Sequence, residues 1–187
     1  MKRICFLLVL MSFSMLASAQ NKTDKQGRRQ GQWTDYHDNG TVKSKGRFVD
    51  GFPVGEFVYY NEKGALHAKK VYSENHIDAT IEVYSEHGSV IATGFYKNKK
   101  RDGEWLYYSE NQGAVILLET YRNGVLDGLC VSYYETGVPQ FEGQYKNGAK
   151  VGEWKTYSPE GDVVSVDSYD EGKVNAPELE SDDFGSF

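Results

Sequence analysis

The sequence predicts an all-β protein, an elongated antiparallel meander of about six repeated β-hairpins. Three observations predict this fold class. The chain repeats itself about every 24 residues, each repeat carries two turn signals, and the segments between the turns are rich in Tyr, Val, Phe and Trp. Apolar and polar residues alternate in the second half of each repeat, and no window holds a helical spacing long enough for a helix. Since one hairpin cannot bury its apolar face alone, each is expected to pack on its neighbours.

The first strand of each repeat is marked by a glycine followed two residues later by an aromatic residue. The glycine column holds Gly31, Gly55, Ala79, Gly103, Gly128 and Gly152, at steps of 24, 24, 24, 25 and 24 residues. The aromatic column holds Trp33, Phe57, Ile81, Trp105, Cys130 and Trp154. A tyrosine column follows three residues later, at Tyr36, Tyr60, Tyr84, Tyr108, Tyr133 and Tyr157. The one extra residue falls in a turn, at 109–113.

The second strand of each repeat follows a turn glycine and ends near another aromatic residue. Its aromatic column holds Phe48, Tyr72, Tyr96, Tyr121, Tyr145 and Tyr169. Two residues before this column stand Gly46, Gly94 and Gly143, and a small residue beside a large ring would allow close aromatic packing between strands. The pairs Asn39-Gly40, Asn123-Gly124 and Asn147-Gly148 are expected to supply the positive φ of tight hairpin turns.

The pattern divides the chain into four parts. Residues 1–19 have a charged start, an apolar run and a small-x-small site, Ala17-Ser18-Ala19, as in a secretion signal. An N-terminal membrane anchor is the alternative, but the run is short for a bilayer core of about 30 Å. Residues 20–30 are a polar segment leading into the array, residues 31–172 are the six repeats, and residues 173–187 are predicted to be an acidic disordered tail. We therefore expect export to the periplasm, the outer envelope or the extracellular space.

The charge and cysteine content limit the function further. Without Lys2 and Arg3 of the signal, the 21 basic and 27 acidic residues become 19 and 27, a formal charge of −8. This balance argues against nucleic acid and against anionic lipid, both of which require clustered Lys and Arg. Cys130 is the single cysteine left after removal of the signal, so the fold cannot depend on an internal disulfide. Cys130 occupies an apolar column and is predicted to be a small buried residue.

No group of residues in the repeats has the pattern of a catalytic or cofactor site. Glu56, Glu104 and Glu153 share one column with Gln32, Thr80 and Leu129, and a column this variable is expected to be a surface position. Carboxylates in one column also point in parallel and do not converge on a bond. The histidines lack the spacing of metal ligands. We expect neither an enzyme nor a bound metal or cofactor.

The aromatic columns are the candidate interaction surface. The first-strand ring and the tyrosine three residues later have opposite parity, so both faces of the sheet are expected to carry rings unless a bulge resets the alternation. Most rings would pack between strands, while those on an open face would form a docking strip for a protein or a glycan. The candidate residues are Trp33, Tyr36, Tyr60, Tyr84, Trp105, Tyr108, Tyr133, Trp154 and Tyr157.

The recurring Asn-Gly-x-x-x-Gly-Glu-Trp-x-x-Tyr and Tyr-x-Asn-Gly segments resemble the MORN repeat, in the bacterial variant form of YwqK-type antitoxins. The resemblance covers roughly Gly27 to Gly172. It implies a MORN-like hairpin array that serves as an interaction surface without chemistry of its own, and the antitoxin form implies a toxin neutralised by binding. This chain departs from that pattern in two features. It carries an export signal, which cytoplasmic antitoxins lack, and it is acidic, whereas lipid-binding relatives would require a basic face.

These observations together predict an exported, non-catalytic repeat protein. The first hypothesis is a protein-interaction scaffold with an antitoxin-like or immunity role. The alternative hypothesis is a cell-envelope glycan-binding protein that uses exposed aromatic rows.

Overall fold

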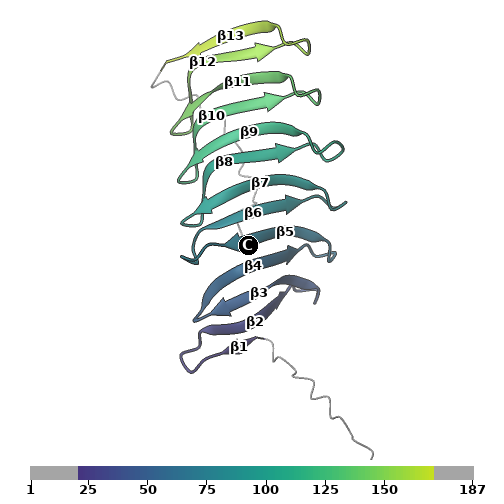
Figure 1. Cartoon of the computed structure of the whole chain (residues 1–187), viewed down its shortest axis with the longest axis vertical. Helices are drawn as coiled ribbons and strands as arrows, with labels where there is room; N and C mark the ends of the chain where they lie inside the picture. The colour runs from purple at the N-terminus through teal and green to yellow at the C-terminus, as the bar shows by residue number, and fades with distance from the viewer. Residues whose placement is uncertain (1–20, 171–187) are drawn as a thin grey trace, which may run out of the picture.

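The computed structural model describes residues 21–170, and they form a single open β-sheet of thirteen strands (Figure 1). Every strand pairs antiparallel with its neighbour in the chain, in the order β1 to β13. The predicted all-β meander of repeated hairpins is therefore confirmed. The predicted signal at 1–19 and the predicted acidic tail at 173–187 lie outside the described residues. None of the described residues belongs to a helix that could span a membrane.

Twelve of the strands make up the six predicted hairpins. The strands are β1 (Lys22–Thr23), β2 (Arg29–Tyr36), β3 (Val42–Val49), β4 (Phe52–Tyr60), β5 (Leu66–Tyr72), β6 (Ala79–Tyr84), β7 (Val90–Lys97), β8 (Lys100–Tyr108), β9 (Val115–Arg122), β10 (Val125–Tyr133), β11 (Pro139–Lys146), β12 (Ala149–Tyr157) and β13 (Val163–Tyr169). The short β1 lies in the polar segment 20–30 and adds a thirteenth strand, which pairs with β2.

The hairpin turns are of two kinds. Asn123-Gly124 and Asn147-Gly148 have positive φ at both residues, as predicted for a two-residue hairpin turn. Asn39-Gly40 differs, because only Gly40 has positive φ and its N–H donates to the carbonyl oxygen of His37. The prediction for Asn39 was wrong because a longer turn needs the left-handed conformation only at its last residue.

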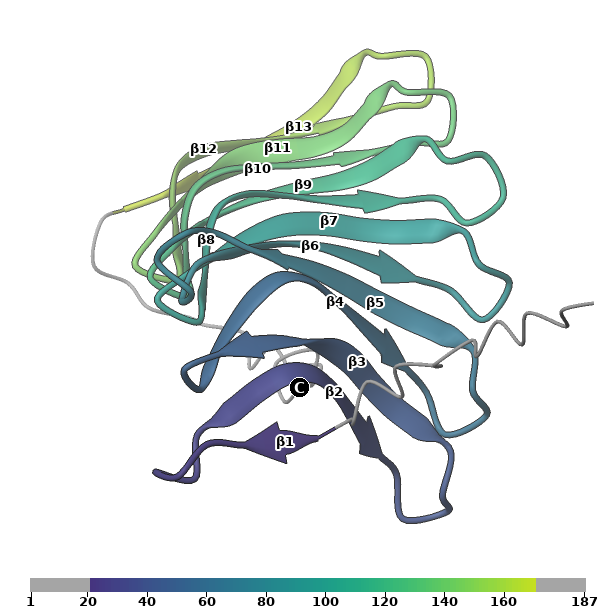
Figure 2. The same ribbon diagram turned by 60° about the horizontal axis from the view of Figure 1, so that its bottom comes forward.

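Bulges bend the sheet into a trough (Figure 2). In β4, β8 and β12 the register shifts so that three residues lie opposite a single glycine of the preceding strand. Each bulge begins at a glycine with φ near 70°: Gly55, Gly103 or Gly152. The β5–β6 pairing, where Ala79 replaces that glycine, has no such shift. The glycine column of the sequence therefore marks the positions where the strands bend.

The core of this one-layer sheet is formed by side chains of its concave face. Buried residues from β4 to β8 form one cluster, which contains Phe57, Tyr59, Ala68, Ile81, Val83, Ala92, Tyr96 and Trp105. Trp105 is the most buried large side chain, at 1% exposure. Because no second layer covers the sheet among the described residues, burial comes from rings that lie across neighbouring strands.

The two ends of the described sheet differ. At the β1 end, the Asn21 side chain donates to the carbonyl oxygen of Thr34 and accepts from its N–H. Asp24 accepts from the N–H groups of Gln26 and Arg28 and from the Arg28 side chain. At the other end, every residue of β13 is exposed. The hydrogen bonds of Asn21 and Asp24 hold the first edge, while β13 ends the sheet with an exposed strand.

Candidate functional site

A ladder of aromatic rings runs along the concave face, across the strands. Phe57 meets the edges of Phe48 and Tyr72, with ring centroids 5.1 and 5.3 Å apart. Trp154 meets Tyr145 and Tyr169 in the same way, at 5.0 and 6.3 Å. These near-perpendicular contacts place the electropositive edge of one ring on the face of the next, a favourable arrangement. The two aromatic columns of the sequence therefore come together in one row of rings across the strands.

Each large ring in the middle of the ladder lies over a glycine. A Cβ atom on Gly46 would overlap the ring of Phe57, and a Cβ atom on Gly94 would overlap Trp105. Gly143 stands under Trp154 in the same relation. This confirms that the small residue in the second strand allows close ring packing.

Cationic side chains cover the outer faces of these rings. The guanidinium of Arg101 lies 4.4 Å from the ring centroid of Trp105, and the Lys150 ammonium lies 4.2 Å from that of Trp154. Arg29 takes the same position above Trp33, at 4.8 Å. Arg101 also donates to the hydroxyl oxygens of two tyrosines of the concave face, each at 3.0 Å. The concave face thus presents rings and positive charges together.

Two hairpins break the ladder because they carry a small residue where the others have a ring. Ile81 and Cys130 take this place, and both are buried. Their cross-strand partners are Lys70 and Glu119, which take the place that glycine has in the strand before each of Phe57, Trp105 and Trp154. The array therefore alternates between a ring over a glycine and a small residue beside a long charged side chain.

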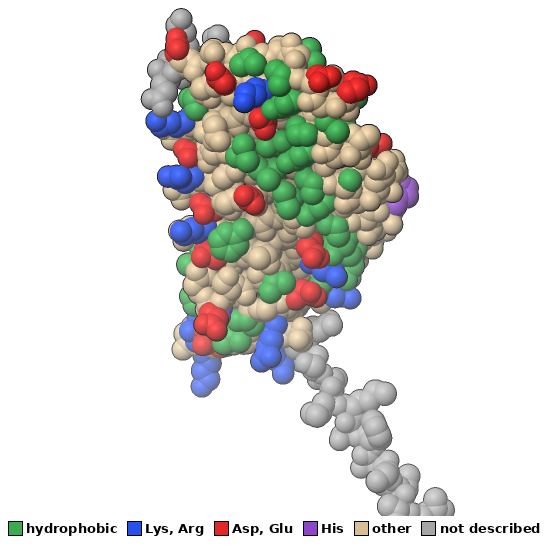
Figure 3. Space-filling view, turned by 45° about the horizontal axis from the view of Figure 1, so that its top comes forward, with side chains coloured by type: hydrophobic (Ala, Val, Ile, Leu, Met, Phe, Trp, Pro, Cys, Tyr) green, Lys and Arg blue, Asp and Glu red, His purple; other side chains and the backbone are tan. Residues whose placement is uncertain are grey.

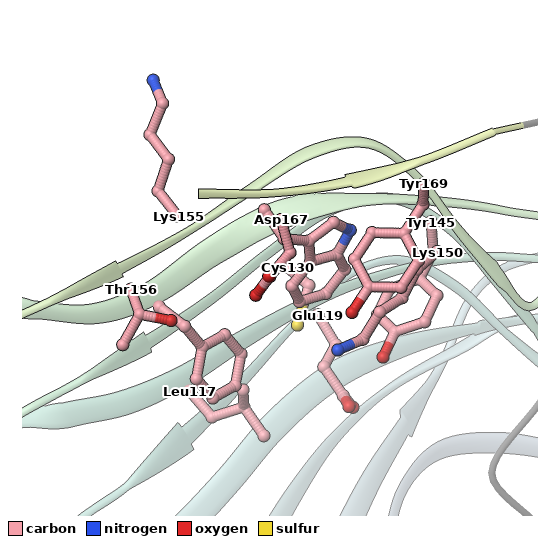
Figure 4. A pocket seen from close by; sticks show the side chains of 11 residues that line it. Leu117, Glu119, Cys130, Tyr145, Lys150, Lys155, Thr156, Asp167 and Tyr169 are labelled. Atoms are coloured by element: carbon pink, nitrogen blue, oxygen red, sulfur yellow. The ribbon is translucent and has the colours of Figure 1, made fainter. Parts of the chain in front are cut away.

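The break at Cys130 opens a hollow of about 310 Å³ in the concave face between β9 and β13 (Figure 4). Trp154, Phe141 and Leu117 provide its apolar lining, and Glu119 and Asp167 its carboxylates. The remaining lining residues are Cys130, Tyr145, Lys150, Lys155, Thr156 and Tyr169. Figure 4 shows their side chains on the concave side of the ribbon, except for Lys155, which points to the convex side.

The electrostatics of the hollow favour neutral thiol and phenol groups. Burial, with a further contribution from Glu119, raises the pKa of the Cys130 thiol to about 12. Burial likewise raises the pKa of Tyr145 to about 12. A thiol with so high a pKa holds its proton at neutral pH and is a poor nucleophile. Glu119 accepts a hydrogen bond from the Tyr121 hydroxyl at 2.8 Å. The hollow is thus suited to binding through rings and carboxylates.

The convex face carries its own tyrosines, as parity predicts. Tyr108 shares a hydrogen bond with the hydroxyl of Thr93 at 3.0 Å, and Tyr157 donates to a carboxylate oxygen of Glu142. Tyr84 donates likewise to Glu82. Thr93, Glu142 and Glu82 each alternate with concave residues along their strands, so these hydroxyl groups reach the convex side.

Apolar side chains lie between the charged groups of this face. Leu118 is the cross-strand neighbour of both Leu106 and Val131. Figure 3 shows hydrophobic side chains gathered along the middle of the face, with acidic and basic groups around them. The convex face therefore carries both hydroxyl-bonded tyrosines and an apolar strip.

The structure separates the nine residues of the predicted interaction surface. Trp105 and Trp154 are 1% and 5% exposed, so including them in an exposed surface was incorrect, because neighbouring rings and cations cover them. Trp33 is half-buried. Tyr36 is 55% exposed, whereas Tyr133 is half-buried at the end of β10. The half-buried Tyr60, Tyr84, Tyr108 and Tyr157 belong to the convex side.

The carboxylate column lies on the surface, as predicted. Glu56, Glu104 and Glu153 are exposed, and Glu104 pairs across the strands with Thr120. Within residues 21–170, no group of three or more His, Cys, Asp or Glu side chains is placed to hold a metal ion. Cys130 is 4% exposed, which confirms the prediction of a small buried residue.

The sequence prediction missed the hollow and most of its lining. A signal was present in the second strands, where Lys70, Gly94, Glu119 and Gly143 alternate between a long charged residue and glycine. The first strand of the following repeat has a small residue after each charged residue and a ring after each glycine. The interpretation of this alternation requires the pairing of residues about eleven positions apart across a turn, which the structure supplies.

Comparisons with known proteins support the repeat assignment. Residues 29–50, 126–147 and 150–173 each match the model of the MORN repeat variant. These segments fall on the first, fifth and sixth hairpins. No curated protein matches the chain. MORN repeats are generally modules of protein or membrane interaction. The chain is therefore a β-hairpin repeat protein in which segments at both ends of the array match the MORN repeat variant.

Proposed function

We propose that this protein is a non-catalytic interaction module that binds a protein partner along the concave face of its sheet. The observation that carries the proposal is the hollow between Cys130 and Trp154. It is a concave surface lined by rings and carboxylates, and it is continuous with the cation-covered ladder. Protein interfaces are commonly anchored by aromatic and charged side chains that enter such depressions.

The proposal includes export and a neutralising role. The apolar run and small-x-small site of residues 1–19 favour action outside the cytoplasm. The repeat resemblance favours binding and neutralising a toxin, which in an exported protein would be an immunity role. The high pKa of Cys130 and the exposure of the carboxylate column both favour binding without chemistry.

The test uses two variants of one strand. Ser165 and Ser168 are both exposed residues of β13. Ser165 pairs with Thr156, which lines the hollow, and Ser168 pairs with Glu153 on the convex side. Ser165→Trp would cover the hollow, and Ser168→Trp adds the same bulk to the opposite face.

The mature protein and both variants are immobilised, and proteins captured from the native cell envelope are identified and then measured by surface plasmon resonance. We expect Ser165→Trp to lower the affinity for the captured partner at least about tenfold, and Ser168→Trp to leave that affinity unchanged. Equal binding by both variants would overturn the concave face as the binding surface. Capture of no protein would overturn the proposed function.

A second candidate function is glycan binding by the convex tyrosines. A shallow depression beside Tyr108, lined also by Thr93, Glu110 and Asn111, offers a ring together with hydroxyl, carboxylate and amide groups. Titration of the mature chain with cell-wall polysaccharide, followed by tyrosine and tryptophan fluorescence, tests it. A response that Tyr108→Ala removes supports this function, and no response across a broad panel excludes it.

A further inference from the structure

Two places in the concave face have the same construction but different contents. At each, a small buried residue replaces the large ring and a long charged side chain replaces the glycine. The first place pairs Ile81 with Lys70, and the second pairs Cys130 with Glu119. We call them the first and the second cradle.

In the first cradle the chain fills the space with its own cation. The Lys70 ammonium lies 4.7 Å from the ring centroid of Tyr96 and 5.7 Å from that of Tyr59. Burial lowers the pKa of Lys70 to about 8, so desolvation opposes the charge even in this favourable position. The arrangement shows that the concave face accommodates a cationic side chain between its rings.

The second cradle has matching rings and the opposite charge. Tyr145 stands where Tyr96 stands in the first cradle, two repeats earlier. Glu119 replaces Lys70, and Asp167 of β13 adds a second carboxylate to the hollow. A cation here would meet rings as Lys70 does, with carboxylates in addition to offset its desolvation.

Two lysines line the second cradle, and neither ammonium occupies its interior, because Lys155 points to the convex side and Lys150 lies over rings at its border. Lys150 lies over the rings of Trp154 and Tyr169, at 4.2 and 5.3 Å from their centroids. The interior beside Cys130 is therefore bordered by two carboxylates and by the rings of Phe141 and Tyr145.

We propose that the second cradle receives a lysine or arginine side chain of the partner protein, held between its rings and its two carboxylates. This inference rests on the proposed function, because it names the chemistry of the group that the concave face binds. The first cradle carries such a cation within the chain, and the second is completed by one from outside.

The probes are four capped tripeptides, Gly-X-Gly, in which X is lysine, arginine, norleucine or glutamate. The reporter is the indole N–H resonance of Trp154, which donates to the carbonyl oxygen of Gln144 beside the cradle. The indole N–H of Trp105, which donates to the Phe95 carbonyl oxygen, is the internal reference. We expect the lysine and arginine peptides to shift the Trp154 resonance, with apparent affinity at least about tenfold above that of norleucine, since the charge makes the difference.

Two variants test the cradle itself. Glu119→Gly combined with Cys130→Trp rebuilds the ring-over-glycine arrangement of Gly94 and Trp105 and fills the hollow. Glu119→Lys gives the second cradle the internal cation of the first. Both are expected to abolish the lysine response, and thermal unfolding of each variant establishes that it folds.

The outcomes separate this inference from the proposed function. Equal shifts with lysine and norleucine, or a lysine response retained in both variants, would overturn the inference. If Ser165→Trp loses the protein partner while no cationic peptide binds, the concave interface stands and the cationic anchor is wrong. If the Trp154 resonance shifts with oligosaccharide and with none of the peptides, the ligand of the second cradle is a glycan and the proposed cationic side chain is wrong.

Discussion

Two pairs of neighbouring strands, β7–β8 and β9–β10, show how the concave face of this array is built. Where β7 meets β8, Gly94 lies under Trp105, and the ring fills the space of both residues. Where β9 meets β10, Glu119 pairs directly with Cys130, and the hollow opens beside them. The same backbone repeat thus gives a packed core at one crossing and a binding space at the next. The difference lies in which strand carries the larger side chain: the second strand at β7–β8, with Trp105, and the first strand at β9–β10, with Glu119.

The largest expected effect comes from removing a packed ring. Trp105→Ala leaves a cavity at the most buried position of the core and should lower the free energy of unfolding by about 3–5 kcal/mol. Trp33→Ala, at the half-buried end of the ladder, should lower it by less, because part of that ring already meets solvent. Urea unfolding of both variants measures the comparison, and equal losses would contradict the role of burial.

The next effect tests the glycine. Gly94→Ala would overlap the Trp105 ring and should destabilise the protein by about 1–3 kcal/mol, as overpacking does. In a Trp105→Ile background, which copies the Ile81 crossing, the same alanine should have little effect. A double-mutant cycle measures this coupling. A Gly94→Ala loss that does not depend on Trp105 would mean that backbone conformation matters there and the ring does not.

A smaller effect is expected from the cation over the ring. Arg101→Met keeps the apolar stem but removes the cation–π contact with Trp105 and the hydrogen bonds to Tyr107 and Tyr121. The loss should be about 1–2 kcal/mol. Lys100→Met, at an exposed neighbouring position, is the control. Unchanged stability in the Arg101 variant would show that the rings alone hold the crossing.

The smallest effect is the pH dependence of the first cradle. Because burial lowers the pKa of Lys70 from 10.5 to about 8, the unfolded chain binds more protons than the folded chain between these values. The free energy of unfolding should therefore rise as pH increases above 8. Cys130 acts in the opposite direction above pH 9, since its pKa is raised from 9 to about 12. The Lys70 contribution should accordingly be clearest between pH 8 and 9.

Denaturant titrations at half-unit steps measure this slope. Lys70→Met should reduce it between pH 8 and 9 relative to the natural chain. Cys130→Ala should leave it unchanged there and reduce the loss of stability above pH 9. An identical slope in the natural and Lys70→Met chains would rule out Lys70 as its source.

Much of the fold could be predicted from local patterns. The 24-residue period, the paired turn glycines and the alternation fixed six antiparallel hairpins, since each of these signals acts within a few residues. The parity argument also placed Tyr108 and Tyr157 on the face opposite the buried rings. The variable residue types in the column of Glu153 predicted its surface position.

The binding surface was less predictable. Trp33, Trp105 and Trp154 occupy one column and look alike in the sequence, yet they differ in burial. Their exposure depends on what the adjacent strands place beside them, including Arg101 and Lys150.

The sequence by itself determined the strands, their order and the two faces, because turn chemistry and period-two alternation are local properties of the chain. Only the tertiary structure decided which face is concave and where that face is hollow. The bulge at Gly152 curves the sheet and brings Trp154 over Gly143, while the register shift in β10 places Cys130 directly opposite Glu119. A hollow is a difference in volume between side chains that meet across strands, so it exists only once those strands are paired.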